Sequence, residues 1–503
     1  MRTQTAFVLL LQLYGSLAYK DPHCADGRTG VVQLFEWRWD DIAAECKNFF
    51  GPYGFCAIQT SPATENRVIS MPTRPWWERF QPVSYKIATR SGNETEFQNM
   101  VKTCADSGVS VYVKAVINHM TSGGSVGVGT GGSHFDGNTL DFPGVPYNIS
   151  DFNDGHECPT LDGNIHDFND VKQVRNCRLV NLLDLRLANP YVRGKIADYF
   201  NHLVELGVAG FQIDASKHMW PDDLKKILDQ VKDVQMGGRP FVYHEVIDYG
   251  GEPIKGDEYL EIGRVTNFKF GRDMGMAFRK HEPLKNLQDF GEGTGLWASG
   301  DVVNFLDNPD EERGFMVSIL TNSDPKLYKL ATAFMLAHPY GIPRILSSYH
   351  FDVTSREHGP PQNADMSIKH VVVNGMNCSN GWICEHRWSE IYNMVAFRNM
   401  AAGKGMSNWW SNANYQIAFS RGDRAFIAFN LEDTDLDQTL TTGLAAGTYC
   451  DVISGYLEND KCTGKSVTVN ADGTARIQVC AKCEQQMLAI HVGAKVGSPA
   501  KRY

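Results

Sequence analysis

Short apolar and β-branched runs, bounded by Gly, Pro and Asn, recur through roughly the first 400 residues, and stretches with helical spacing lie between several of them. Alternating strands and helices are typical of a parallel sheet. Eight runs are predicted to be strands, namely Val31 to Trp37, Phe55 to Thr60, Ser110 to Asn118, Val208 to Asp214, Phe241 to Val246, Arg264 to Phe268, Asp301 to Asp307 and Gly341 to Ser347. Together they predict an α/β fold, a (β/α)₈ TIM barrel.

Two helices between these strands can be recognised from their patterns. Trp39 to Phe50 starts with acidic residues, and Asn189 to Leu206 follows an Asn cap with apolar positions at helical spacing. The third and fourth strands are about ninety residues apart, and the interval is rich in Gly, Asn and Asp. A segment of this length is either disordered or an inserted subdomain, and the presence of Cys158 and Cys177 favours a subdomain.

The pattern changes after about Lys404. Alternating strand-like pieces follow, such as Tyr415 to Phe419, Ala425 to Asn430 and Ser466 to Asn470, with turn residues between them. This pattern predicts a C-terminal antiparallel all-β domain. The predicted division of the chain is a signal peptide at 1–18, a barrel at 19–117 and 187–404, an inserted subdomain at 118–186 and a β-sandwich domain at 405–503.

The first eighteen residues have the form of a secretory signal peptide. Arg2 gives a charged start, Ala6 to Leu11 an apolar centre, and Ser16 to Ala18 a small-residue exit, so cleavage is expected near Tyr19. No later stretch has the eighteen or so uninterrupted apolar residues that a membrane helix needs. The mature protein is therefore expected to be secreted and soluble, with no membrane partner. The full chain of 503 residues should contain two or three domains.

Charge and cysteine content narrow the function further. The net charge is −10, with no basic run that could follow a phosphate backbone, which argues against a nucleic-acid partner. In an exported chain the twelve cysteines are expected to form disulfides. Cys480 and Cys483 form a lone CxxC pair, for which one disulfide or two separate bonds are favoured over redox chemistry.

Carboxylates follow several predicted strands, at the barrel rim where active sites of this fold lie. Asp214 ends the fourth run, Glu245 the fifth, and Asp310 follows the seventh. A single carboxylate at a strand end is commonly structural, as a helix cap or a partner of a Lys. Three at one rim repel one another and raise at least one pKa, which gives the protonated acid and ionised nucleophile that glycosidic cleavage requires.

Several long motifs resemble the animal α-amylases, in the same order along the chain. They are Asp214-Ala-Ser-Lys-His, Tyr243-His-Glu-Val-Ile-Asp, Phe305-Leu-Asp-Asn-Pro-Asp, Arg74-Pro-Trp-Trp-Glu-Arg, Phe334-Met-Leu-Ala-His-Pro-Tyr-Gly and Gly447-Thr-Tyr-Cys-Asp-Val-Ile-Ser-Gly. The resemblance covers nearly the whole mature chain. It implies internal hydrolysis of α-1,4-glucans such as starch and glycogen with retention, by a protein that is a monomer.

The resemblance also implies roles for individual residues. Asp214 would be the nucleophile, Glu245 the general acid and then base, and Asp310 the residue that holds sugar hydroxyls and stabilises the transition state. The implied substrate-binding residues are Trp76, Trp77, Gln81, His119, Lys217 and His218. Aromatic rings suit sugars because sugar faces are apolar whereas the hydroxyls need directional partners.

The same resemblance implies a calcium ion between the barrel and the inserted subdomain. The matching positions are Asn118 and Asp184 by side chain, with Arg175 and His218 by backbone carbonyl, all of them oxygen donors. The implied disulfides are Cys46 with Cys104, Cys158 with Cys177, Cys378 with Cys384 and Cys450 with Cys462. Cys24, Cys56, Cys480 and Cys483 have no counterpart in that set.

The chain departs from the family pattern at three positions around the site. Gln212 stands where the family has an arginine that positions the carboxylates and helps bind chloride; Asn308 and Arg344 match the other two chloride positions. Chloride independence, or no chloride site, is therefore expected. Lys114 replaces an aspartate, and Pro309 replaces a histidine that contacts sugar. Loss of such a contact typically costs about 3 kcal/mol, so reduced activity is expected.

Two hypotheses follow from these departures. In the first, Lys114 enters from the adjacent strand and supplies the positive charge that Gln212 lacks. In the second, the chain is a catalytically weak or inactive paralogue that binds α-glucans. A transglycosylase or transporter branch of the superfamily would need different subsites or a membrane anchor, and neither is visible in the sequence.

Overall fold

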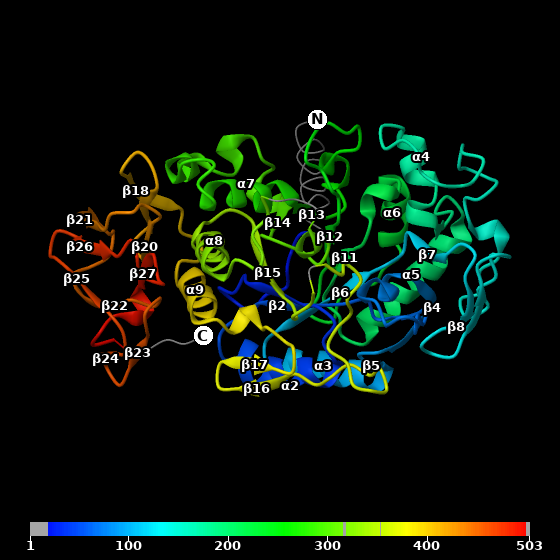
Figure 1. Cartoon of the computed structure of the whole chain (residues 1–503), viewed down its shortest axis with the longest axis horizontal. Coiled ribbons are helices and arrows are strands. Elements are labelled where there is room, and N and C mark those ends of the chain that lie inside the picture. Colours follow the sequence, from blue (N-terminus) through cyan, green and yellow to red (C-terminus); the bar gives the residue numbers. More distant parts are fainter. Residues whose placement is uncertain (1–18, 315–317, 353, 499–503) are drawn as a thin grey trace, which may run out of the picture.

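The computed structural model describes residues 19–314, 318–352 and 354–498. The predicted signal peptide lies outside them. Figure 1 shows three parts: a central barrel, a segment beside it coloured cyan, and a small β domain in orange and red on the opposite side. No helix among the described residues is long and apolar enough to cross a bilayer.

The barrel is closed by eight strands, in the order β1-β15-β14-β13-β12-β11-β6-β2. The strands are β1 (Val31–Leu34), β2 (Ala57–Thr60), β6 (Ser110–Ala115), β11 (Gly210–Ile213), β12 (Phe241–His244), β13 (Arg264–Asn267), β14 (Val302–Asn304) and β15 (Ile342–Ser347). Every neighbouring pair is parallel. All eight predicted strands are confirmed, with somewhat shorter bounds.

Helices cover the outside of the barrel and bury their apolar faces against the strands. They are α2 (Trp39–Glu45), α3 (Glu94–Asp106), α5 (Pro190–Glu205), α6 (Pro221–Leu228), α7 (Phe268–Phe278), α8 (Pro325–Ala337) and α9 (Ser389–Met400). Both predicted helices are confirmed. The Asn189 side chain accepts from Tyr191 N at the start of α5. The first predicted helix continues from α2 as a π-helical turn over Cys46–Phe50.

The long interval between β6 and β11 is an ordered inserted segment. It contains β7 (His119–Ser122), β8 (Val126–Val128), β9 (His134–Asp136), α4 (Val171–Asn176) and β10 (Leu182–Asp184). A disulfide joins Cys158 to Cys177, and β10 pairs antiparallel with β7 beside the end of β6. The segment therefore returns to the barrel rim at Asp184.

The C-terminal part is an antiparallel all-β domain, as predicted. One sheet has the order β18-β19-β20-β27, formed by Met406–Ser411, Gln416–Arg421, Ala425–Asn430 and Met487–His491. The remaining strands pair as β21 (Leu436–Thr441) with β26 (Thr474–Val479), β22 (Gly447–Cys450) with β25 (Ser466–Val469), and β23 (Leu457–Glu458) with β24 (Lys461–Cys462). Phe419 and Phe429 contact the ring of Phe334 on α8, so the domain packs directly on the barrel helices.

The twelve cysteines form six disulfides, and no described cysteine is free. The four pairs implied by the resemblance are all present. The remaining pairs are Cys24 with Cys56 and Cys480 with Cys483. The first ties the segment before β1 to the start of β2, and the second resolves the CxxC pair as one disulfide.

A buried ion cluster ties α2 to the segment that follows β15. The Glu45 carboxylate accepts from Arg387 at 2.6 Å and 2.8 Å and contacts Nε2 of His386 at 2.9 Å. Burial alone would raise the pKa of Glu45, but these hydrogen bonds lower it below its usual value. The carboxylate is therefore charged in a buried place and depends on its partners.

Substitution Arg387→Met should destabilise the fold by roughly 3–5 kcal/mol, because it leaves the Glu45 charge buried without its bidentate partner. Urea denaturation followed by fluorescence would measure this loss. The matched control is Arg476→Met, which breaks an exposed pair with Asp437 and should cost less than about 1 kcal/mol. Equal effects of the two substitutions would contradict the prediction.

Candidate active site

A cleft of about 400 Å³ opens at the C-terminal ends of the barrel strands. It is lined by residues from the ends of β11, β12 and β14, from the turn around Trp76 and from the inserted segment. These are Trp76, Trp77, Phe80, His119, Leu179, Leu182, Asp214, Ala215, Lys217, His218, Glu245, Ile247, Tyr249, Phe268, Asn308, Asp310 and Glu311. The three strand-end carboxylates thus share one cleft.

Asp214 and Glu245 lie close together because β11 and β12 are neighbours and end at the same height. Ile213 pairs with His244, so the residues that follow them, Asp214 and Glu245, lie side by side at the barrel rim. Nζ of Lys114 lies 2.9 Å from Asp214 Oδ1 and 2.7 Å from Glu245 Oε2. The side chains of the two carboxylates are only 11% and 12% exposed. The site is therefore a desolvated acid pair joined by one cation.

Burial raises the pKa of Glu245, and the charge of Asp214 adds to this effect, while Lys114 opposes it. The desolvating cleft walls, followed by repulsion from Glu245, raise the pKa of Asp310 to about 6. Asp310 is exposed, whereas Asp214 is buried and Glu245 is half-buried. We therefore attribute the raised pKa of Asp310 mainly to repulsion from Glu245. The group can hold a proton on one carboxyl while another is ionised.

Aromatic rings form one wall of the cleft. Trp76 and Trp77 are half-buried in a short helix over Trp76–Phe80. Nε1 of Trp76 donates to the carbonyl of Arg356 at 2.9 Å, and the Arg313 guanidinium lies 4.8 Å from the Trp76 ring centroid. The Trp76 ring is therefore held rigidly in place.

Other predicted binding residues have protein partners. Lys217 Nζ donates to the Ile247 carbonyl at 3.0 Å and contacts Glu252. Nε2 of His119 lies 3.0 Å from the Phe80 carbonyl, and burial lowers the pKa of His119 to about 4, so the ring is neutral at pH 7. Gln81 does not line the cleft. Its side-chain oxygen accepts from Ser122 N at 3.2 Å, which anchors the inserted segment.

The four positions suggested for calcium form two pairs where the barrel meets the inserted segment. The Leu185 amide donates to the Asn118 carbonyl at 2.9 Å, which brings Asn118 next to Asp184. His218 Nδ1 contacts the Val174 carbonyl at 2.8 Å, which brings His218 next to Arg175. Oδ1 of Asn118 is buried without a hydrogen-bond partner. An unpartnered oxygen beside a buried carboxylate suits a hard cation.

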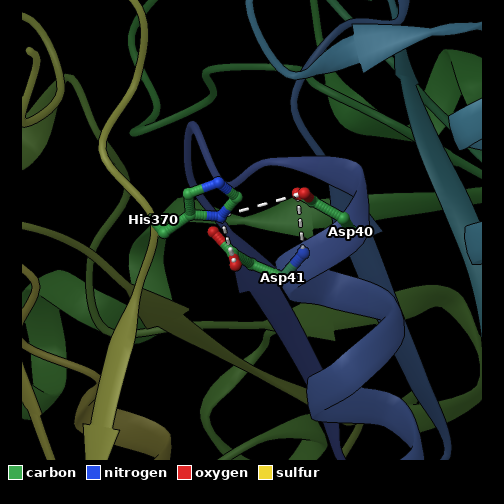
Figure 2. Close-up of side chains that lie close together, drawn as sticks. All are labelled: Asp40, Asp41 and His370. Atoms are coloured by element: carbon green, nitrogen blue, oxygen red, sulfur yellow. Dashed lines mark hydrogen bonds and ion pairs between the residues drawn. The ribbon is translucent and has the colours of Figure 1, made fainter.

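A second group of possible metal ligands lies elsewhere. Figure 2 shows Asp40 and Asp41 at the start of α2 facing His370 from the segment before β16 (Val372–Asn374). Asp41 already accepts from the Val371 amide at 3.0 Å and contacts His370 Nδ1 at 3.0 Å. This group ties the start of α2 to the segment before β16, and its position at the surface gives no indication of a bound ion.

The three positions matched to chloride are Gln212, Asn308 and Arg344, and only the side chain of Arg344 is positively charged. Arg344 Nη1 donates to Gln59 Oε1 at 3.2 Å, whereas its Nε is buried without a partner. The Asn308 side chain accepts from the Glu311 amide at 2.8 Å. Gln212 is neutral and bonded to Gln59. Pro309 offers only its carbonyl, which accepts from Arg313 at 2.6 Å.

Sequence reasoning missed several residues of the cleft. Glu311 and Tyr249 face each other, with the Tyr249 hydroxyl donating to Glu311 Oε1 at 2.6 Å. Burial raises the pKa of Glu311 to about 8 despite this bond. Phe268, the first residue of α7, also lines the cleft. Glu311 follows Asp310 directly and Tyr249 lies four residues after Glu245, which was the signal for these two; Phe268 has no such signal in the sequence.

Comparisons with known proteins agree with this geometry. Residues 81–247 match the model of the alpha amylase catalytic domain, and residues 409–493 that of the alpha amylase C-terminal all-beta domain. The chain is 53% identical to the alpha-amylase of Pecten maximus over 96% of both chains. It is 50% identical to human alpha-amylase 2B, over 97% of this chain and 99% of the relative.

Solved structures give the same result. Alpha-amylase I from Eisenia fetida superimposes with a TM-score of 0.89 at 45% identity, covering 93% of this chain and 98% of that one. A maltohexaose complex of a variant of that enzyme gives a TM-score of 0.90. With an eight-stranded barrel, an all-β C-terminal domain and a cleft with three strand-end carboxylates, the chain belongs to the α-amylase family of glycoside hydrolases.

Proposed function

We propose that the protein hydrolyses internal α-1,4-glucosidic bonds of starch or glycogen with retention of configuration. The spacing of Asp214 and Glu245 is the observation that carries this proposal. Two oxygens that contact one nitrogen at 2.9 Å and 2.7 Å cannot be farther apart than these distances added together, about 5.6 Å. Retaining enzymes hold their two carboxyl groups roughly 5–5.5 Å apart, whereas inverting enzymes need room for a water.

In the first step an Asp214 oxygen attacks C1 of the sugar, the bond from C1 to the glycosidic oxygen breaks, and the proton of Glu245 passes to the leaving oxygen. In the second step a water attacks C1 while Glu245 takes its proton, and the bond from C1 to Asp214 breaks. The raised pKa of Glu245 suits the first step, because it keeps this carboxyl protonated. Asp310 stabilises the positive charge that develops on the sugar.

Substrate binding relies on the aromatic wall. Trp76 and Trp77 stack on glucose faces, and Lys217, His119 and His218 line the sites beside them. Gln81 contributes indirectly, through the inserted segment that it anchors. Because Pro309 lacks a side-chain donor, one sugar contact is missing and turnover should be lower than in a chain with a histidine there.

The inactive, glucan-binding alternative has no support. All three carboxylates are retained and converge in one cleft. A binding module has no need for an acid pair of this spacing.

The disulfides support secretion, because such bonds persist in oxidising compartments. We also propose that the mature protein is a monomer that acts on α-glucan, and that its barrel, inserted subdomain and C-terminal domain have the boundaries predicted above. We further propose that Asn118 and Asp184, with the carbonyls of Arg175 and His218, hold a calcium ion. Bound there, calcium would fix the inserted segment against the barrel rim.

Substitution Glu245→Gln should lower starch hydrolysis by roughly 10²–10⁴-fold, because the amide can neither give nor take the proton. The measurement is the release of reducing ends from starch in the presence of calcium. Glu205→Gln, on the exposed end of α5, is the matched control and should keep full activity. Glucan binding by the unsubstituted protein without turnover would favour the inactive paralogue.

Calcium should raise the melting temperature of the protein, and a chelator should lower it, because the ion binds the folded state alone. At a calcium concentration one hundred times Kd the gain is about 2.7 kcal/mol. Asp184→Asn should remove most of this response, whereas Asp40→Asn, in the exposed group of Figure 2, should leave it intact. If Asp40→Asn removes the response and Asp184→Asn does not, the calcium ion binds near Asp40, and the site proposed at Asp184 is wrong.

Replacing chloride by gluconate should leave starch hydrolysis unchanged, since Gln212 supplies no charge to the position matched to the halide. The unpartnered Nε of Arg344 is a donor that could attract an anion there. Activity that rises with chloride concentration at constant ionic strength would therefore contradict the prediction.

A further inference from the structure

Lys114 lies at the centre of the carboxylate group. It is the register partner of Gln212, so it enters the site from β6 directly beside β11. Its side chain is 7% exposed, and its Nζ contacts both Asp214 and Glu245. The ammonium also lies 5.3 Å from the Phe80 ring centroid, which restricts its position further.

Within the described residues, Lys114 is the basic side chain that forms ion pairs with Asp214 and Glu245. Gln212 beside it is neutral, and its amide oxygen is occupied by Gln59. Arg344 acts on Glu245 only at longer range. The balance of charge in the acid pair therefore depends on one lysine.

The charge of the pair is the same in both halves of the proposed reaction. Before cleavage Asp214 is ionised and Glu245 protonated; in the glycosyl-enzyme Asp214 is a neutral ester and Glu245 is ionised. Each state carries one negative charge, and only its place changes. Because the Lys114 ammonium lies within 3 Å of both oxygens, it stabilises the negative charge in either place and does not have to move.

We propose that Lys114 is a positioning residue, which holds Asp214 and Glu245 around one sugar carbon and balances their single negative charge in both half-reactions. This inference rests on the proposed function, because that reaction defines the two charge states. A purely structural lysine would stabilise the fold without setting the pH range of catalysis.

Other titratable groups, some of them charged, also face the pair. Asp310 approaches from the loop after β14, Tyr243 from β12 and Arg344 from β15, and Glu311 and Arg313 lie beside Asp310. All of them remain when Lys114 is replaced. Lys114 also lowers the pKa of Asp310, so loss of the lysine should raise the pKa values of Glu245 and Asp310 in the same direction.

The test is the pH dependence of kcat/KM on a maltooligosaccharide for Lys114→Met. Loss of a cation beside carboxylates raises their pKa values by roughly 1–3 units. The acidic limb, which reports ionisation of the pair, and the basic limb, which reports loss of the acid proton, should both move to higher pH. At the original optimum kcat should fall about a hundredfold.

Two further variants complete the design. Gln212→Arg in the Lys114→Met background restores a cation from the neighbouring strand and should return both limbs toward their original pH. Lys102→Met, which removes an exposed lysine on α3, should change neither limb. If Lys114→Met does not fold, the double variant carries the test, and limbs that stay at high pH in it would overturn the proposal.

The outcomes separate this inference from the proposed function. Suppose that the protein is active and Glu245→Gln abolishes turnover, but Lys114→Met leaves both limbs of the pH profile where they were. The proposed role of Lys114 would then be wrong, and the proposed function would stand. A protein that does not cleave starch would overturn the proposed function first. Movement of both limbs together, with recovery in the double variant, supports the role.

Discussion

Two carboxylates held close together in a desolvated cleft repel each other, and a cation between them is what allows the arrangement to persist. Lys114 provides that cation for Asp214 and Glu245. Burial and repulsion from Asp214 both raise the pKa of Glu245, and Lys114 opposes the two effects. The rest of the barrel serves to bring these three side chains to one rim.

The parallel register of the strands sets their heights. Lys114 lies beside Gln212, and Ile213 lies beside His244, so the residues that follow β11 and β12 emerge side by side. Buried ion pairs further out hold the surrounding elements, as Glu45 does between α2 and Arg387. Disulfides fix segments that have few apolar contacts of their own, such as the one around Cys158 and Cys177.

The inserted segment and the cleft are linked through the rim. Asn118 ends the loop after β6, Asp184 returns on β10, and His218 follows Asp214 by four residues. An ion held by these residues would stabilise the same turn that carries Lys217 into the cleft. With that ion, structural and catalytic demands would meet in a few residues at the ends of β6 and β11.

The sequence by itself determined the eight strands, the all-β C-terminal domain and the three strand-end carboxylates, because strand patterns and the polar residues that end them are local features. It also showed that Gln212 and Lys114 depart from the family pattern. Only the tertiary structure decided that the Lys114 amine reaches both carboxylates, that Cys24 pairs with Cys56, and that Gln81 faces the inserted segment. These contacts join residues far apart in the chain, and they depend on barrel closure and side-chain packing, which no local pattern encodes.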